Sequence, residues 1–358
     1  MAALGLAHGA PTSYSPSKMN GATSNGHANG ISKESLPQVR VLPNTASVDE
    51  VVDALKIAGG AVIKNAVAHE DLDVIEKDLR PLLEKDAPWD GEFFPKQTRR
   101  CYGLIPNSRT CAEKVVMHPL YQATCDKFLT TKNWFWSGHK KTYATSRPQI
   151  MNSVCFSINP GAHKQPLHRD DWCYHVVNKK IEKYPEDLQR DTGLGWFVAA
   201  KDATQENGCT RFIPGSHLWE HEREPDDSLV AYAELKKGDG FMMFASCYHG
   251  GGANNTVDQE RLLFSCFMTR GWLRQEENHY LNMSLETARS LPLELQKIAG
   301  YDLSEPFLGW VNSTNPRVVL DPTIEASPST LLPVTLFVEL TLCACTGRKG
   351  HGEERERR

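Results

Sequence analysis

Residues 149–163, QIMNSVCFSINPGAH, open the part of the chain that decides the fold. A β-prone run ends there at a cluster of Asn, Pro and Gly, and the same pattern then repeats to residue 272. The later runs are CYHVV (173–177), LGWFVAA (194–200), GCTRFI (208–213), SLVAYAEL (228–235), DGFMMFAS (239–246) and RLLFSCFMTRGW (261–272). Short strands separated by turn residues are typical of sandwiches and barrels. The sequence therefore predicts a mainly β protein, a cupin-like jelly roll of two sheets with flanking helices.

Helical patterns flank this β region on both sides. Apolar residues recur at helical spacing over 47–57, where Ser47 and Glu50 form a capping-box pattern before Gly59. Further helices are predicted over 69–85, interrupted near Pro81, over 112–129, and over 284–298. We expect one domain, residues 37–320, with a helical part (47–130) and a jelly-roll core (about 149–275). Residues 1–36 read as a disordered arm, and residues 321–358 as an atypical, disordered tail.

Composition narrows the class of protein. The 358 residues carry a net charge of −4, so no positive field would attract nucleic acid or anionic lipid. No apolar run reaches the ~20 residues of a membrane span. The ten cysteines form no CxxC pair, which favours free thiols in a reducing compartment. We expect a cytoplasmic enzyme that binds a small molecule, neither nucleic acid nor membrane, and a homodimer stays open.

The segment PLHRDDW, residues 166–172, carries the chemistry. His168 and Asp170 are two apart, so on a strand both side chains would point to one face. A second imidazole on the facing sheet would complete the facial triad of non-haem Fe(II) oxygenases. His249, after an apolar run and before three glycines, is the candidate.

The two-residue spacing of His168 and Asp170 is by itself weak evidence for a metal site. Composition predicts about 1.6 pairs of the form H-x-[DE], and three occur, at His69, His168 and His351. His69 stands at the start of a predicted helix, where residues two apart do not share a face, and His351 lies in a polar tail. Only His168 stands among predicted strands.

Arg261 lies twelve residues after His249 and opens the next apolar run. A hairpin would bring it back beside His249, where a guanidinium can bind a carboxylate with two hydrogen bonds. The plain alternative is a surface arginine paired with an acid such as Glu260.

With PLHRDDW, the segments DATQENGCTRFIPGSH (202–217), YHGGGANN (248–255) and GWVNSTNPR (309–317) resemble the phytanoyl-CoA dioxygenase family, most closely its fungal secondary-metabolite branch. The resemblance implies a double-stranded β-helix that uses Fe(II), 2-oxoglutarate and O2. It implies His168, Asp170 and His249 as catalytic iron ligands. By the same resemblance Arg261, Gln165 and Thr204 would bind 2-oxoglutarate.

The resemblance also implies oxidation of an unactivated C–H bond of a hydrophobic small molecule, such as a terpenoid or an alkaloid. Tyr102, Trp172 and Trp196 are candidates for the substrate pocket. Two alternatives stay open: a cupin-like metal-dependent oxygenase or isomerase that uses no 2-oxoglutarate, and a non-catalytic partner subunit.

Overall fold

The computed structural model describes residues 32–324. Most of the predicted arm (1–36) and most of the predicted tail (321–358) lie outside these residues. Where the arm is described, Lys33–Ser35 form a 3-10 helix, and Leu36 packs against a small cluster around Ile213 and Trp219.

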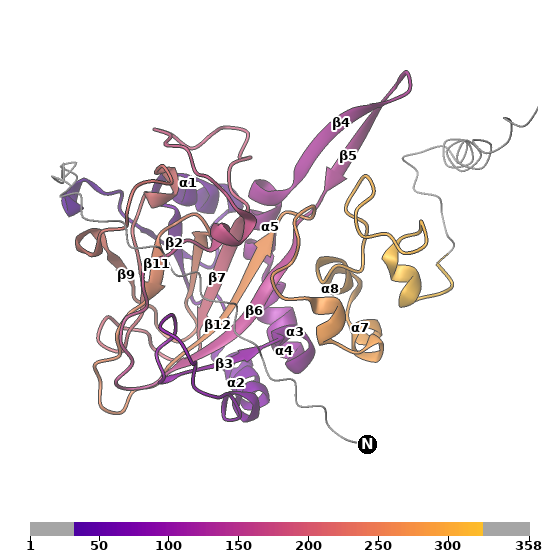
Figure 1. Ribbon diagram of the computed structural model, residues 1–358. Coiled ribbons are helices and arrows are strands. Elements are labelled where there is room, and N and C mark those ends of the chain that lie inside the picture. The colour runs from indigo at the N-terminus through magenta and orange to yellow at the C-terminus, as the bar shows by residue number, and fades with distance from the viewer. Residues whose placement is uncertain (1–31, 325–358) are drawn as a thin grey trace, which may run out of the picture.

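Seven strands form the larger sheet, in the order β1-β2-β10-β7-β12-β6-β3 (Figure 1). All its neighbours are antiparallel except β1 and β2. A three-stranded sheet has the order β11-β8-β9, and β4 and β5 form a hairpin that projects from the body in Figure 1. The strands are β1 (Arg40–Pro43), β2 (Gly60–Lys64), β3 (Thr98–Tyr102), β4 (Thr131–Ser137), β5 (Lys140–Ser146), β6 (Gln149–Ile158), β7 (Gly193–Ala199), β8 (Thr210–Phe212), β9 (Ala231–Ala233), β10 (Gly240–Phe244), β11 (His249–Gly251) and β12 (Arg261–Thr269).

Six of the seven β-prone runs contain a strand, β6 to β10 and β12. The run CYHVV does not. Asp170–Tyr174 form a 3-10 helix there, which ends at His175 in the left-handed region (φ 55°). The predicted division into a helical part and a β core does not hold either, because β1, β2 and β3 come from before residue 130 and join the larger sheet. The structure is therefore a large, mostly antiparallel sheet, a smaller sheet and helices.

The helices are α1 (Val48–Ala58), α2 (His69–Leu83), α3 (Leu104–Asn107), α4 (Arg109–Cys111), a π-helix (Ala112–Val116), α5 (Pro119–Leu129), α6 (His279–Asn282), α7 (Leu285–Ser290) and α8 (Leu293–Ile298). The Ser47–Glu50 capping box is confirmed, as is the stop at Gly59, which has φ 75°. The predicted interruption at Pro81 was wrong, because α2 continues through this proline to Leu83.

Two predicted helices are each divided in two. The helix over 112–129 breaks before Pro119, and that over 284–298 breaks before Leu293, at Pro292. Proline disfavours the helical conformation in the residue that precedes it, so each helix restarts at or just after the proline.

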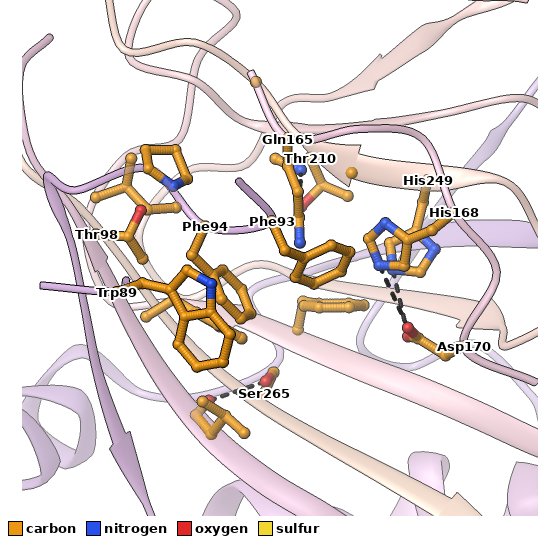
Figure 2. A pocket seen from close by; sticks show the side chains of 18 of the residues that line it. Trp89, Phe93, Phe94, Thr98, Gln165, His168, Asp170, Thr210, His249 and Ser265 are labelled. Atoms are coloured by element: carbon orange, nitrogen blue, oxygen red, sulfur yellow. Dashed lines mark hydrogen bonds and ion pairs between the residues drawn. The ribbon is translucent and has the colours of Figure 1, made fainter. Parts of the chain in front are cut away.

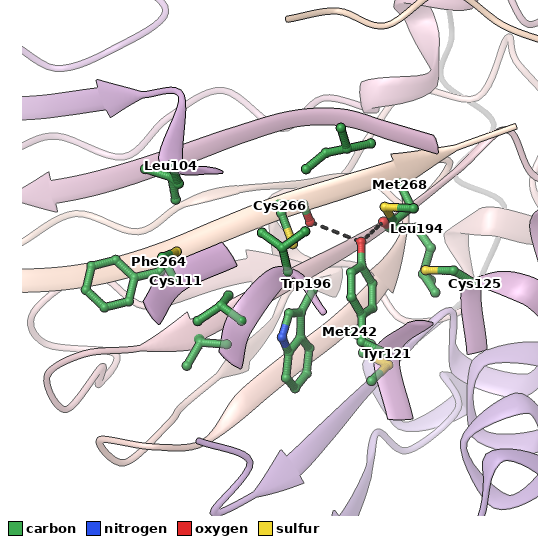
Figure 3. Close-up of a cluster of buried hydrophobic side chains, with 14 of the residues drawn as sticks. Leu104, Cys111, Tyr121, Cys125, Leu194, Trp196, Met242, Phe264, Cys266 and Met268 are labelled. Atoms are coloured by element: carbon green, nitrogen blue, oxygen red, sulfur yellow. Dashed lines mark hydrogen bonds between the residues drawn. The ribbon is translucent and has the colours of Figure 1, made fainter. Parts of the chain in front are cut away.

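The main core lies between the helices and one face of the larger sheet (Figure 3). Trp196 is fully buried there and stacks on Tyr121, with ring centroids 5.8 Å apart. The Tyr121 hydroxyl donates to the Leu194 carbonyl oxygen (2.8 Å) and so ties α5 to β7. Since side chains alternate along a strand, the neighbours of Trp196 on β7 point to the opposite face of the sheet.

Among residues 32–324, no helix is long and apolar enough to cross a membrane. The eight cysteines in this range are free thiols, and seven of them are buried.

Candidate metal centre

His168 and His249 are direct neighbours across an isolated antiparallel bridge. Each backbone N–H donates to the carbonyl oxygen of the other residue, at 2.9 Å in both directions. Asp170 begins the 3-10 helix, and its N–H donates to the Ala245 carbonyl oxygen (2.8 Å). The predicted convergence thus arises differently than expected. His168 and Asp170 do not share a regular strand, and His249 pairs with His168 instead of facing it from another sheet.

Backbone contacts orient both imidazoles. The Nδ1 atom of His168 lies 2.9 Å from the Pro166 carbonyl oxygen, and that of His249 lies 3.1 Å from the Cys247 carbonyl oxygen. A carbonyl only accepts, so Nδ1 donates its proton in each ring, which leaves Nε2 as the atom of each ring that can bind a metal. Both Nε2 atoms lie 3.3 Å from an Asp170 carboxylate oxygen, and one ligand atom from each residue lies within 4.8 Å of the others (Figure 2). Two imidazole nitrogens and one carboxylate form a donor set that suits a divalent transition metal.

The electrostatics of the three groups agree with this donor set. Burial raises the pKa of Asp170, but the adjacent imidazoles outweigh burial and hold that pKa well below its usual range. Burial lowers the pKa of His168, and the hydrogen bond and charge of Asp170 reverse this into a net rise. The carboxylate is therefore ionised and ready to bind a cation.

Arg261 opens β12 and is 4% exposed. Its guanidinium donates to the Gly208 carbonyl oxygen, while its buried Nε has no partner within residues 32–324. Burial lowers the pKa of Arg261 to about 10, so the group stays charged at neutral pH. A buried cation with an unused donor that lines a cavity is a fitting anchor for a ligand carboxylate.

The predicted hairpin between His249 and Arg261 does not form. β11 belongs to the smaller sheet and β12 to the larger one, so the two residues reach the cavity from different sheets. Glu260 does not pair with Arg261 either, because it binds Arg80 (2.6 Å) and Lys201 (2.5 Å).

Gln165 and Thr210 lie next to each other in Figure 2 and line the same cavity as Arg261. The Gly251 N–H donates to Gln165 Oε1 (3.1 Å), which leaves the amide NH2 group of Gln165 free to donate elsewhere. Gly251 is paired with Thr210 across β11 and β8. A Cβ at Gly251 would lie 3.5 Å from Arg261 Nη1 and 3.8 Å from Gln165 Oε1, so this glycine keeps the space between them open.

Thr204 is not among the residues that line the cavity. Its hydroxyl accepts from the Asn207 N–H (3.2 Å), and its own N–H donates to Asn207 Oδ1 (2.8 Å). Thr204 thus closes the turn before β8. The threonine of the segment DATQENGCT that lines the cavity is Thr210. Only the pairing of β8 with β11 distinguishes the two.

The cavity has a volume of about 340 Å³ and extends from Arg261 past the metal centre. Tyr102 and Trp172 line it, as expected of pocket residues. Trp196 does not, because it points into the core on the other face of β7, and its neighbour Phe197 lines the cavity instead. Phe197 contacts His249 edge to face, with centroids 6.4 Å apart.

Sequence reasoning missed an aromatic loop. Trp89, Phe93 and Phe94, in the segment after α2, all line the cavity. The Phe93 ring meets His168 edge to face (4.9 Å between centroids) and stacks on Trp172 (5.9 Å). Three aromatic residues within the polar stretch APWDGEFFP were the available signal.

Asn152 and Glu276 were also missed. Both line the cavity, and Asn152 Nδ2 donates to Glu276 Oε2 (2.5 Å). Burial raises the pKa of Glu276, and the hydrogen bond from Asn152 opposes that rise. Nothing in the sequence distinguishes Glu276 from its neighbour Glu277.

Comparison with known proteins agrees with this site. The profile of the phytanoyl-CoA dioxygenase family (PhyH) matches residues 55–262. The dioxygenase cnsJ of Penicillium expansum is 36% identical over 294 residues, which cover 80% of this chain and 87% of that protein. The dioxygenase himG of Aspergillus japonicus is 38% identical over 289 residues, 78% of this chain and 88% of that protein.

Among solved structures, HygX of Streptomyces hygroscopicus with nickel and 2-oxoglutarate bound aligns with a TM-score of 0.46 and 15% identity, over 64% of this chain and 90% of that one. That likeness is too low to inform the function. The family match extends over more than half of the chain, and the donor set and the buried arginine fit the reagents of such enzymes. The chain therefore belongs to the phytanoyl-CoA dioxygenase family, and it is an oxidoreductase, a dioxygenase that uses Fe(II), 2-oxoglutarate and O2.

Proposed function

We propose that this dioxygenase oxidises an unactivated C–H bond of a hydrophobic small molecule in fungal-type secondary metabolism. His168, Asp170 and His249 would hold the iron, and Arg261, Gln165 and Thr210 would hold 2-oxoglutarate, with Thr210 in place of Thr204. One observation carries the assignment. Two imidazoles direct their Nε2 atoms at one carboxylate, in the same cavity as a buried arginine with an unused donor.

The arrangement of the two sheets supports a double-stranded β-helix. The larger sheet contributes Arg261 and Phe197, and the smaller one contributes His249 and Thr210, to a single cavity. A cavity enclosed by two sheets is the arrangement expected of a double-stranded β-helix, which we propose as the fold.

The residues of the chain bind, orient and exclude water. When bound, iron and 2-oxoglutarate supply the oxidising power for C–H cleavage. The backbone carbonyls of Pro166 and Cys247 keep both imidazoles in the tautomer that binds a metal. The buried guanidinium of Arg261 fixes a carboxylate in a region of low dielectric, where the ion pair is strong. Phe93, Phe197 and Trp172 surround the metal centre with apolar surface that displaces water.

An anaerobic titration with Fe(II) and 2-oxoglutarate tests the assignment. Wild type should develop the visible charge-transfer band of an iron–keto acid chelate. His168→Ala should abolish the band, and Arg261→Ala should shift its formation to higher 2-oxoglutarate concentration. If folded wild-type protein binds iron but shows no band, 2-oxoglutarate is not the co-substrate. The cupin-like and the non-catalytic alternatives would then be favoured. A cytoplasmic location, a small-molecule partner and a homodimer remain predictions from the sequence.

A further inference from the structure

Three side chains that line the cavity carry a formal charge at neutral pH: Asp170, Arg261 and Glu276. The proposed function uses the first two, for the metal and for the co-substrate carboxylate. Glu276 has no role in either, and no lysine or arginine forms an ion pair with it within residues 32–324. Glu276 is exposed and lines the cavity, so its carboxylate is accessible to a ligand that enters from solvent.

The next residue, Glu277, shows how the chain satisfies a structural carboxylate. Glu277 Oε2 accepts from the Ser153 N–H (3.0 Å) and from the Ser153 hydroxyl (3.2 Å), and Asn282 donates to Oε1. Within residues 32–324, Glu276 accepts one side-chain hydrogen bond, from Asn152. A carboxylate has about four acceptor sites, so Glu276 can accept further hydrogen bonds from a ligand.

The strand register places Glu276 at the end of the cavity opposite Arg261. Arg261 pairs with Ile158 across β12 and β6, whereas Asn152, which holds Glu276, pairs with Phe267. Six residues of strand separate these positions, about 20 Å. The metal centre lies between them, because Phe197, which contacts His249, pairs with Ser265 in the middle of β12.

Two exposed aromatic side chains line the same cavity as Glu276. Tyr102 pairs with Val154, one cavity-facing position from Asn152. Its hydroxyl donates no hydrogen bond within residues 32–324, and its side chain is 49% exposed. Trp172 lines the cavity and is 59% exposed, although Phe93 stacks on its ring. Electron-rich faces next to a carboxylate are the usual surroundings of a bound ammonium group.

We propose that the substrate carries a protonated amine on an apolar skeleton, and that Glu276 binds this ammonium group while the iron oxidises a nearby carbon. This inference rests on the proposed function and adds the substrate class. Asn152 is the positioning residue that fixes the carboxylate, and Tyr102 and Trp172 contribute cation–π contacts. Glu276 is a specificity residue and takes no part in the chemistry.

Three probes of nearly equal shape test the proposal: phenylbutylamine, phenylbutanol and phenylbutyrate. Each is titrated by calorimetry into anaerobic enzyme loaded with Fe(II) and 2-oxoglutarate. Wild type should bind the amine about 5- to 10-fold more tightly than the alcohol, as expected for a charge-assisted contact with some access to solvent. Glu276→Gln should remove this preference, and Glu276→Lys should favour the butyrate.

The matched control is Glu222→Gln, which removes an exposed carboxylate that does not line the cavity and should keep the preference for the amine. The charge-transfer band of each sample reports metal and co-substrate binding separately. Equal affinity of wild type for amine and alcohol, or a preference that survives Glu276→Gln, would overturn the inference while the band stays intact. Loss of the band in wild type would instead contradict the proposed function.

Discussion

The two ends of the cavity are built on different principles. At one end Arg261 is 4% exposed and bound to a backbone carbonyl, with Gln165 fixed by the Gly251 N–H. At the other end Glu276 follows β12 and lies among side chains that are about half exposed. The first end is a rigid, dry site for a small anion. The second can accommodate a larger ligand at the open side of the cavity.

The metal centre joins the two ends, and its loss should have the largest effect. Asp170→Ala removes the only carboxylate ligand and should weaken Fe(II) binding by more than about 100-fold, since even residues behind the ligands contribute 10- to 100-fold. Metal titration of the anaerobic protein measures this. Asp171→Asn is the matched control, because Asp171 binds Asn178 (2.8 Å) and is not part of the donor set. Equal losses in both variants would mean a folding defect.

The rigid end should be the next most sensitive. Arg261→Ala should raise the Kd for 2-oxoglutarate about 10- to 100-fold, because charge-assisted hydrogen bonds to a buried group are lost. Arg261→Lys should lie between wild type and Arg261→Ala, since it keeps the charge but not the paired donors. Iron affinity should stay within about twofold in both variants. An unchanged Kd for 2-oxoglutarate would exclude Arg261 as the anchor.

The two threonines of the segment 202–210 test which residues bind 2-oxoglutarate at the Arg261 end of the cavity. Thr210→Val should raise the Kd for 2-oxoglutarate about 2- to 10-fold through the loss of one neutral hydrogen bond. Thr204→Val should leave this Kd unchanged and lower the free energy of unfolding by about 0.5–1.5 kcal/mol, because a turn contact is lost. Calorimetric titration and denaturant unfolding measure the two effects. The reverse outcome would restore Thr204 as the co-substrate residue.

Trp196 should have the smallest effect on the site. Trp196→Phe should lower the free energy of unfolding by about 1–3 kcal/mol, because it leaves a void against Tyr121 and Gly240. The affinities for iron, 2-oxoglutarate and the amine probe should not change, since the sheet separates this side chain from the cavity. A clear change in any of these affinities would show that the two faces of β7 are coupled.

Local patterns predicted much of this molecule well. The capping box at Ser47, the stop at Gly59 and six of the β-prone runs depend on residues close together in the chain. Predictions failed where a distant partner decides the outcome. Strands β1 and β3 are short and lack a clear alternation, so only their neighbours in the larger sheet identify them.

The site divides in the same way. His168, Asp170, His249 and Arg261 could be selected from residue type, spacing and family resemblance, because metal ligands and carboxylate anchors allow few alternatives. The sequence by itself therefore determined the chemistry of the metal centre.

The tertiary structure decided which residues surround the metal centre. The face of the sheet that the helices cover turns Trp196 inward and Phe197 toward His249, and the β8–β11 pairing brings Thr210 to the cavity in place of Thr204. The tertiary structure also distinguishes two adjacent glutamates: Ser153 and Asn282 bind Glu277, whereas Glu276 lines the cavity. Side chains along a strand point alternately to the two faces of the sheet, and only packing against distant elements decides which face a given side chain takes.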